Sequence, residues 1–94
     1  MRRTADFPTA RPLPLLGTMC KHFGHKITIE QQDTGAVMHF PAGLVTAEAT
    51  ETGLCLTIKA ADEDGFARTR DVLISHMLRF AHREAPEAPD WRDA

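Results

Sequence analysis

The sequence predicts an α+β fold, a two-layer sandwich in which a mainly antiparallel sheet carries two helices on one face. Two patterns lead to this prediction. In the middle of the chain, four short segments alternate apolar and polar residues and are separated by turn residues, as in strands joined by hairpins. On either side lie segments whose apolar residues recur every three or four positions, as in helices with one buried stripe. With one more strand at the N-terminus, the expected order is β-α-β-β-β-β-α.

The N-terminal part of the chain is predicted to form a strand over residues 2–7 and a helix over residues 12–23. Pro12 and Pro14 are compatible with this helix because both fall in its first turn, where backbone N–H groups have no intrahelical acceptor. Gly24 is expected to end the helix in the left-handed conformation. The residues expected on its buried stripe are Leu13, Leu16, Cys20 and Phe23.

Four strands are expected in the middle of the chain. Their predicted ranges are 27–30, 36–40, 44–50 and 54–59, of which the third has the weakest alternation. Turn residues such as Asp33, Gly35 and Gly53 interrupt the alternation between them. Because these connections are short, consecutive strands should pair as an antiparallel meander.

The second helix follows the last of these strands. Asp62 or Asp64 can cap its start, where acidic groups suit the helix dipole. The helix should end near Glu84, because Pro86 and Pro89 follow closely. Its expected buried stripe comprises Phe66, Leu73, Met77 and Phe80, widened by Ile74 and Ala81.

The chain of 94 residues is long enough for one modest hydrophobic core, so a single α+β domain is expected over residues 1–84. Residues 85–94 form an acidic, proline-containing tail in which Trp91 is the one large apolar side chain. Trp91 is expected to pin this tail to the domain, because a large aromatic side chain gains by burial.

Composition and charge narrow the class of protein. With 43% hydrophobic and 26% charged residues, the chain is typical of globular proteins. Its formal net charge of −2 argues against a nucleic-acid partner, because such proteins generally carry a basic excess. No apolar stretch reaches the roughly 20 residues needed to cross a membrane. Two cysteines and the lack of an apolar signal core predict a cytoplasmic protein with free thiols.

Histidine is concentrated in two short stretches, residues 20–26 and 76–83. Together they contain four of the five histidines and four of the eleven Lys and Arg residues. Imidazole and cationic groups in this density are typical of a site for an anion or a metal. A metal held by His22 or His25 with a distant histidine such as His39 has no support from spacing.

Cys20 and His22 look like a metal-binding fragment, but helix geometry argues against that interpretation. Residues two apart lie about 200° apart around a helix, so they cannot hold one ion together. Cys20 falls on the buried stripe and is expected to be a small apolar core residue. Cys55 alternates to the other face of the sheet, so no disulfide is expected between the two.

His76 lies about 60° from the centre of the second helix's apolar stripe, at its border. Arg79 and Arg83 follow along this border, and their guanidinium groups could hold a carboxylate or a phosphate. The alternative is a solvated flank whose cations complement the helix dipole. His82 points nearly the opposite way and is expected to be exposed.

Familiar enzyme motifs are absent: the sequence has no phosphate-binding glycine loop, no nucleophile elbow and no CxxC pair. It has no tyrosine, and its one serine, Ser75, lies inside the second predicted helix. Because covalent catalysis then has few candidate nucleophiles, no catalytic residue is assigned and a binding role is favoured over an enzymatic one.

The runs at residues 20–26, 40–43 and 76–81, with the later Trp91, resemble the bacterial family called domain of unknown function 2218. The resemblance extends from Thr4 to about Trp91. It implies a small bacterial cytoplasmic domain with a link to iron acquisition, because some members are joined to siderophore-interacting flavoprotein reductases. It implies no established activity, ligand or cofactor. The residues that match the family pattern are Cys20, Lys21, His22, Phe23, His25, Lys26, His76, Arg79 and Phe80; the prolines that begin the first helix depart from it.

Three functions compete. The first is a non-enzymatic binding or accessory module that holds a small anionic ligand, such as a ferric siderophore or haem, between the two basic stretches. The second is a metal-dependent enzyme or redox helper that uses the histidines. The third is a structural homodimer formed through the uncovered sheet face, where Val37, Cys55 and Thr57 point outward and are not strongly polar. The residues expected to bind the anion are Lys21, His22, His25, His76, Arg79 and Arg83.

The first hypothesis makes a spatial prediction. Both helices have only one apolar stripe, so both should pack on the same face of the sheet. Phe23 and Phe80 would then meet in the core, leaving His25 and His76 within about 10 Å of each other at its rim.

Overall fold

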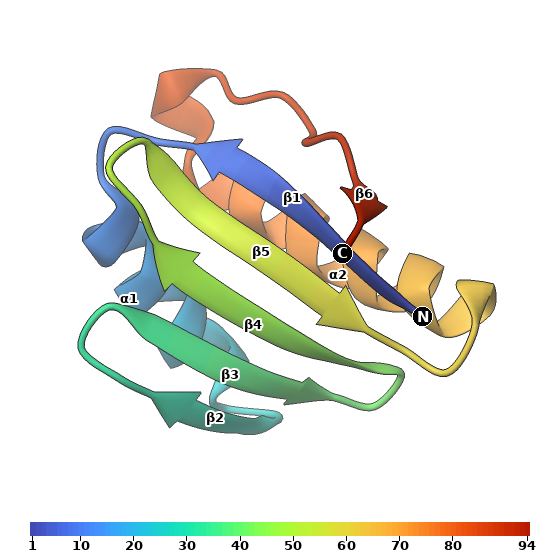
Figure 1. Ribbon diagram of the computed structural model, residues 1–94. Coiled ribbons are helices and arrows are strands. Elements are labelled where there is room, and N and C mark those ends of the chain that lie inside the picture. Colours follow the sequence, from blue (N-terminus) through green and yellow to red (C-terminus); the bar gives the residue numbers. More distant parts are fainter.

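The computed structural model describes residues 1–94 and shows a six-stranded antiparallel sheet with both helices on one face (Figure 1). The sheet order is β2-β3-β4-β5-β1-β6. The predicted fold class is therefore confirmed, including the antiparallel meander from β2 to β5. The elements are β1 (Arg2–Pro8), α1 (Pro12–Phe23), β2 (Thr28–Gln31), β3 (Gly35–Phe40), β4 (Gly43–Ala49), β5 (Gly53–Lys59), α2 (Glu63–Phe80), the 3-10 helix η1 (His82–Glu84) and β6 (Arg92–Asp93).

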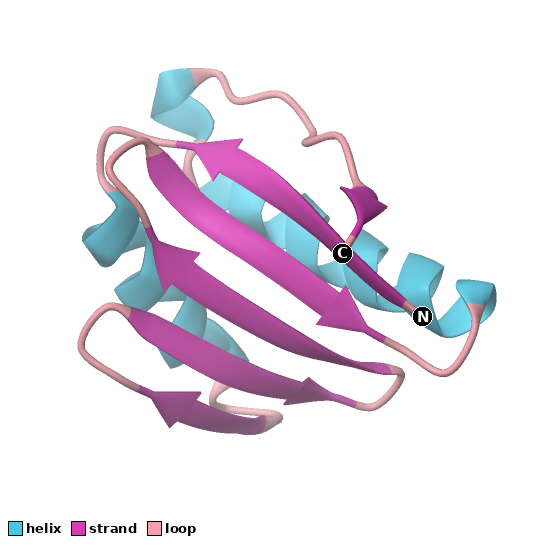
Figure 2. Ribbon diagram, viewed as in Figure 1, coloured by secondary structure: helices cyan, strands magenta, loops and turns pink.

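The core lies between the helices and the inner face of the sheet (Figure 2). Along each strand, side chains point alternately to this inner face and to the outer face. One inner row shows the pattern: Ile58 of β5, Val45 of β4 and Met38 of β3 pair in register across the sheet, and none of the three is exposed to solvent. Because side chains alternate along a strand, the intervening residues face outward. Neither helix is both long and apolar enough to span a membrane.

The buried stripe of α1 differs from the predicted one. Leu13 is 50% exposed, whereas Leu15 and Met19, which the periodicity did not select, are buried. The centre of the buried residues lies about 90° around the helix from Leu13, which places this residue at the border of the stripe. The sequence allows both alignments, because Leu13, Leu15 and Leu16 are all apolar and only packing on the sheet decides between them.

Gly24 also departs from the prediction. Its φ of −62° and ψ of −15° are right-handed, and its N–H donates to the Cys20 carbonyl at 2.9 Å. The chain therefore continues the helical curve for one more residue. A turn closes it, in which the Ile27 N–H donates to the Phe23 carbonyl at 3.0 Å.

α2 begins as predicted, with Asp62 as its cap: the carboxylate accepts a hydrogen bond from the Gly65 N–H at 2.8 Å. The α-helix ends at Phe80, and η1 carries the chain on to Glu84. The buried stripe of α2 includes Thr69, which the apolar pattern did not predict. The Thr69 hydroxyl donates to the Gly65 carbonyl at 2.8 Å, so its burial leaves no polar atom without a partner.

The C-terminal tail runs back beside β1, where β6 forms the edge of the sheet and Arg92 pairs with Thr4 (Figure 1). The Trp91 ring packs edge-on against Phe66 of α2, with the ring centroids 5.5 Å apart. The strand β6 was not predicted, because two residues are too few to show alternation.

Candidate functional site

The two histidine-containing stretches meet where the C-terminal end of α1 lies beside the C-terminal half of α2. The rings of His22 and His76 are in contact, with centroids 4.8 Å apart. Each ring also lies against a phenylalanine of the other helix: His22 is 5.2 Å from Phe80, and His76 is 5.2 Å from Phe23. Four aromatic rings from two helices thus form one cluster at the rim of the core, here called the histidine cluster.

The hydrogen bonds of the two imidazoles leave nitrogen atoms available. Nδ1 of His76 lies 2.7 Å from the Val72 carbonyl oxygen and donates to it, which fixes the tautomer and leaves Nε2 unprotonated in the neutral ring. Nε2 of His76 and both nitrogens of His22 have no hydrogen-bond partner in the protein. The cluster therefore presents free imidazole nitrogens to solvent.

The charged groups that act on His22 in the histidine cluster are all positive. Contacts with neighbouring groups remove part of the hydration of the His22 ring, and this desolvation is the main cause that lowers its pKa. Positive charge on His76, Lys26, Arg79 and His25 lowers the pKa of His22 further, in that order. Neither Arg79 nor Lys26 forms an ion pair with a carboxylate.

The structure brings together most of the residues expected at an anion site. Of the six expected residues, His22 and His76 belong to the histidine cluster, and His25 and Arg79 lie near enough for their charges to act on His22; Lys26, which was not among the six, acts on His22 in the same way. Lys26 belongs to the basic stretch 20–26, and the turn that ends α1 places it near His22.

The expected contact between Phe23 and Phe80 is replaced by a different arrangement. His22 packs against Phe80, while Phe23 packs against Phe40 of β3 with centroids 5.1 Å apart. His22 rather than His25 is consequently the direct neighbour of His76.

The other two expected residues, Lys21 and Arg83, lie elsewhere. Lys21 is exposed, and it is about 170° around α1 from the centre of the buried stripe, so it faces solvent. Arg83 belongs to η1 and lines a separate cleft. His39, a candidate metal ligand, lies in β3, and its Nε2 is 2.6 Å from a carboxylate oxygen of Glu30.

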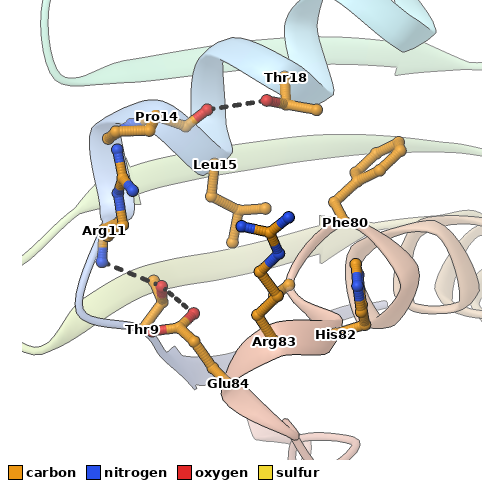
Figure 3. Close-up of a pocket in the computed structure, with 10 residues that line it drawn as sticks. Thr9, Arg11, Pro14, Leu15, Thr18, Phe80, His82, Arg83 and Glu84 are labelled. Carbon is orange, nitrogen blue, oxygen red and sulfur yellow. Dashed lines mark hydrogen bonds between the residues drawn. The ribbon is translucent and has the colours of Figure 1, made fainter.

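That cleft lies between the N-terminal half of α1 and the segment that follows α2, with a volume of about 290 Å³ (Figure 3). Leu15 and Phe80 line its apolar part, and Arg11, Arg83 and Glu84 line its polar part. Phe80 also contacts His22, so its ring belongs to the histidine cluster and lines the cleft as well.

The cysteines occupy different environments. Cys20 is buried on the inner side, and desolvation raises the pKa of its thiol. Cys55 is half-buried on the outer face of the sheet, where its sulfur is 3.6 Å from the Thr4 hydroxyl. No group of three or more His, Cys, Asp or Glu side chains is placed to hold a metal ion; His22 and His76 are a pair.

The sequence of residues 4–92 matches a family described as an uncharacterized protein conserved in bacteria, domain of unknown function 2218 (DUF2218). The chain belongs to this family. The fold is also that of the protein PA4090 from Pseudomonas aeruginosa, whose NMR structure gives a TM-score of 0.80 at 24% sequence identity. The similarity covers 99% of this chain and 98% of that chain, and it establishes the shared fold. No curated protein matches the chain.

Proposed function

We propose that this DUF2218 domain is a binding module that holds a small anionic ligand at the histidine cluster. The observation that carries the proposal is the contact between His22 and His76, with Arg79 and Lys26 nearby and unpaired. Without a ligand, the positive groups around His22 repel one another, which is why they disfavour the protonated form of this ring. An anion relieves this repulsion, so the same charges that destabilise the empty site favour the bound one.

The chemistry of the cluster also favours an anion over a metal ion. Arg79 and Lys26 repel a cation, whereas Arg79 can donate two parallel hydrogen bonds to one carboxylate or phosphate. The free nitrogens of His22 and His76 can add further donors once protonated. Ferric siderophores and haem, which carry carboxylates or negative charge, are the candidate ligands, and they agree with the link to iron acquisition expected from the family resemblance.

Calorimetry with inorganic phosphate, haem and a ferric siderophore tests this function. We expect micromolar binding of at least one of them, and a loss of about tenfold or more in affinity for the Arg79→Gln variant, because a charge-assisted hydrogen bond is removed. Arg68→Gln is the matched control: Arg68 lies in the same helix but is exposed and paired with Asp64 at 3.0 Å. Absence of micromolar binding by all three, or equal affinities of the two variants, contradicts the proposal.

The outer face of the sheet supports homodimerisation as a second candidate function, because no helix covers it (Figure 2). Its central row is uncharged on four adjacent strands. On one side of this row, Arg2 and Lys59 are cross-strand neighbours of like charge; on the other side lie Asp6 and Glu48. The central row runs through Val37, Thr46, Thr57 and Thr4.

This charge pattern is self-complementary. Rotating a second copy by 180° about the uncharged row places its acidic side opposite the basic side of the first copy. Light scattering at micromolar concentrations should then detect a dimer that Lys59→Glu weakens and that the exchanged pair Lys59→Glu with Glu48→Lys restores. A strict monomer at these concentrations contradicts this candidate.

A further inference from the structure

The cleft of Figure 3 contains a cation that the protein itself does not neutralise. Arg83 extends from η1 toward α1, and in this view its guanidinium lies between Leu15 and Phe80 (Figure 3). It forms no ion pair, although the carboxylate of Glu84 is next to it in sequence.

Glu84 is committed to other partners. Its carboxylate accepts hydrogen bonds from the Thr9 hydroxyl at 2.6 Å and from the Ala10 N–H at 2.8 Å. These two bonds, led by that from Thr9, lower the pKa of Glu84, and the nearby charge of Arg11 lowers it further. Glu84 therefore holds η1 to the loop before α1, with Arg11 partly compensating its charge. Arg83 is left as the cation free to bind a ligand.

The rest of the cleft is suited to an apolar group. Leu15 is only 7% exposed and Ala81 likewise, so the floor is core surface rather than flexible side chains. Phe80 and Pro14 add apolar surface on either side. A volume of about 290 Å³ is at the small end of ligand pockets, which run from roughly 300 to 1,000 Å³.

We propose that this cleft binds a small organic acid, with the carboxylate on Arg83 and the apolar part on Leu15 and Phe80. Guanidinium and carboxylate groups match as a planar, two-bond pair, and an apolar chain gains by leaving water for the cleft floor. The charge of Glu84 directs the carboxylate of the ligand toward the guanidinium of Arg83 and away from the Arg11 side. This site shares the Phe80 ring with the histidine cluster, but its cation is Arg83 and it uses neither histidine of the cluster.

Hexanoate is the probe, titrated into the full chain while backbone amide chemical shifts are followed by NMR. We expect shifts centred on residues 15–18 and 80–83, with hexanoate binding at least several-fold more tightly than acetate, which lacks the apolar chain. Arg83→Gln should weaken hexanoate binding about tenfold, and more than Arg11→Gln does, because Arg11 is partly compensated by Glu84. Arg68→Gln, a change of the same kind far from the cleft, should leave it unchanged.

The outcome separates this proposal from the function of the histidine cluster. Arg79→Gln is expected to weaken phosphate binding without altering the hexanoate shifts at residues 15–18. Equal affinities for hexanoate and acetate, an unchanged affinity in Arg83→Gln, or hexanoate shifts centred on His22 and His76 would each overturn the assignment of the cleft. A failure of phosphate to bind leaves the hexanoate result to stand by itself.

Discussion

Leu16→Ala is expected to lower the free energy of unfolding by about 2–5 kcal/mol. Leu16 is 2% exposed and belongs to the single core cluster that joins both helices to the sheet. Truncation removes buried apolar surface and leaves a cavity that the surrounding side chains fill only in part. Since domains of this size are stable by only about 5–15 kcal/mol, the loss is a large share of the total.

Urea unfolding measures the effect, and Leu13→Ala provides the matched control in the same helix. Leu13 is 50% exposed, so its truncation should change the free energy of unfolding by no more than about 0.5 kcal/mol. If the two variants lost equal stability, or if Leu13→Ala lost more, the alignment of α1 on the sheet described above would be wrong.

The same pair of leucines shows where the sequence could and could not predict the fold. Alternation and periodicity located both helices and the five longer strands, because each pattern is set by local geometry. The rotation of α1 about its axis is a tertiary property: with leucine at 13, 15 and 16, the helix has two apolar alignments, and the sheet selects one. Thr69 was missed for a related reason, since its hydroxyl is satisfied by its own helix and the residue is buried as if it were apolar.

The candidate site was predictable to a similar extent. Composition pointed to both histidine stretches, and the one-sided stripes of the helices predicted that the stretches meet. The pairing itself depends on how the helices cross, which placed His22 rather than His25 against His76. Arg11 gave no signal at all, because its role comes from its position beside Glu84, which is distant in sequence.

Binding of an anion at the histidine cluster should strengthen as the pH falls. In the empty protein, desolvation and neighbouring positive charge lower the pKa of His22 below its usual 6.5, so the ring is neutral near pH 7. A bound anion favours the charged imidazole and raises this pKa, so binding takes up a proton. Affinity therefore increases with acidity, by about tenfold for each pKa unit that separates the free and bound states.

The stability of the protein without ligand should fall, rather than rise, as the pH decreases. A histidine whose pKa is lowered by folding takes up its proton more readily in the unfolded chain. The His22 contribution therefore reduces stability as the pH falls below about 6.5, and an anion should reverse this reduction. Glu84 contributes at more acidic pH, because folding lowers its pKa below the usual 4.5. Protonation of its carboxylate below that pH removes this contribution and also lowers stability.

Sulfate is the appropriate probe, because it keeps the same charge between about pH 8 and about pH 5.5, a range that includes the titration of histidine and excludes that of Glu84. Calorimetry across this range should show rising affinity and proton uptake, and thermal melts should show that added sulfate stabilises most at the acidic end. His22→Gln should flatten the affinity profile, whereas His82→Gln should preserve it, because His82 lies in η1 beside the separate cleft. A pH-independent affinity, or a profile that His22→Gln leaves unchanged, would show that His22 does not bind the anion.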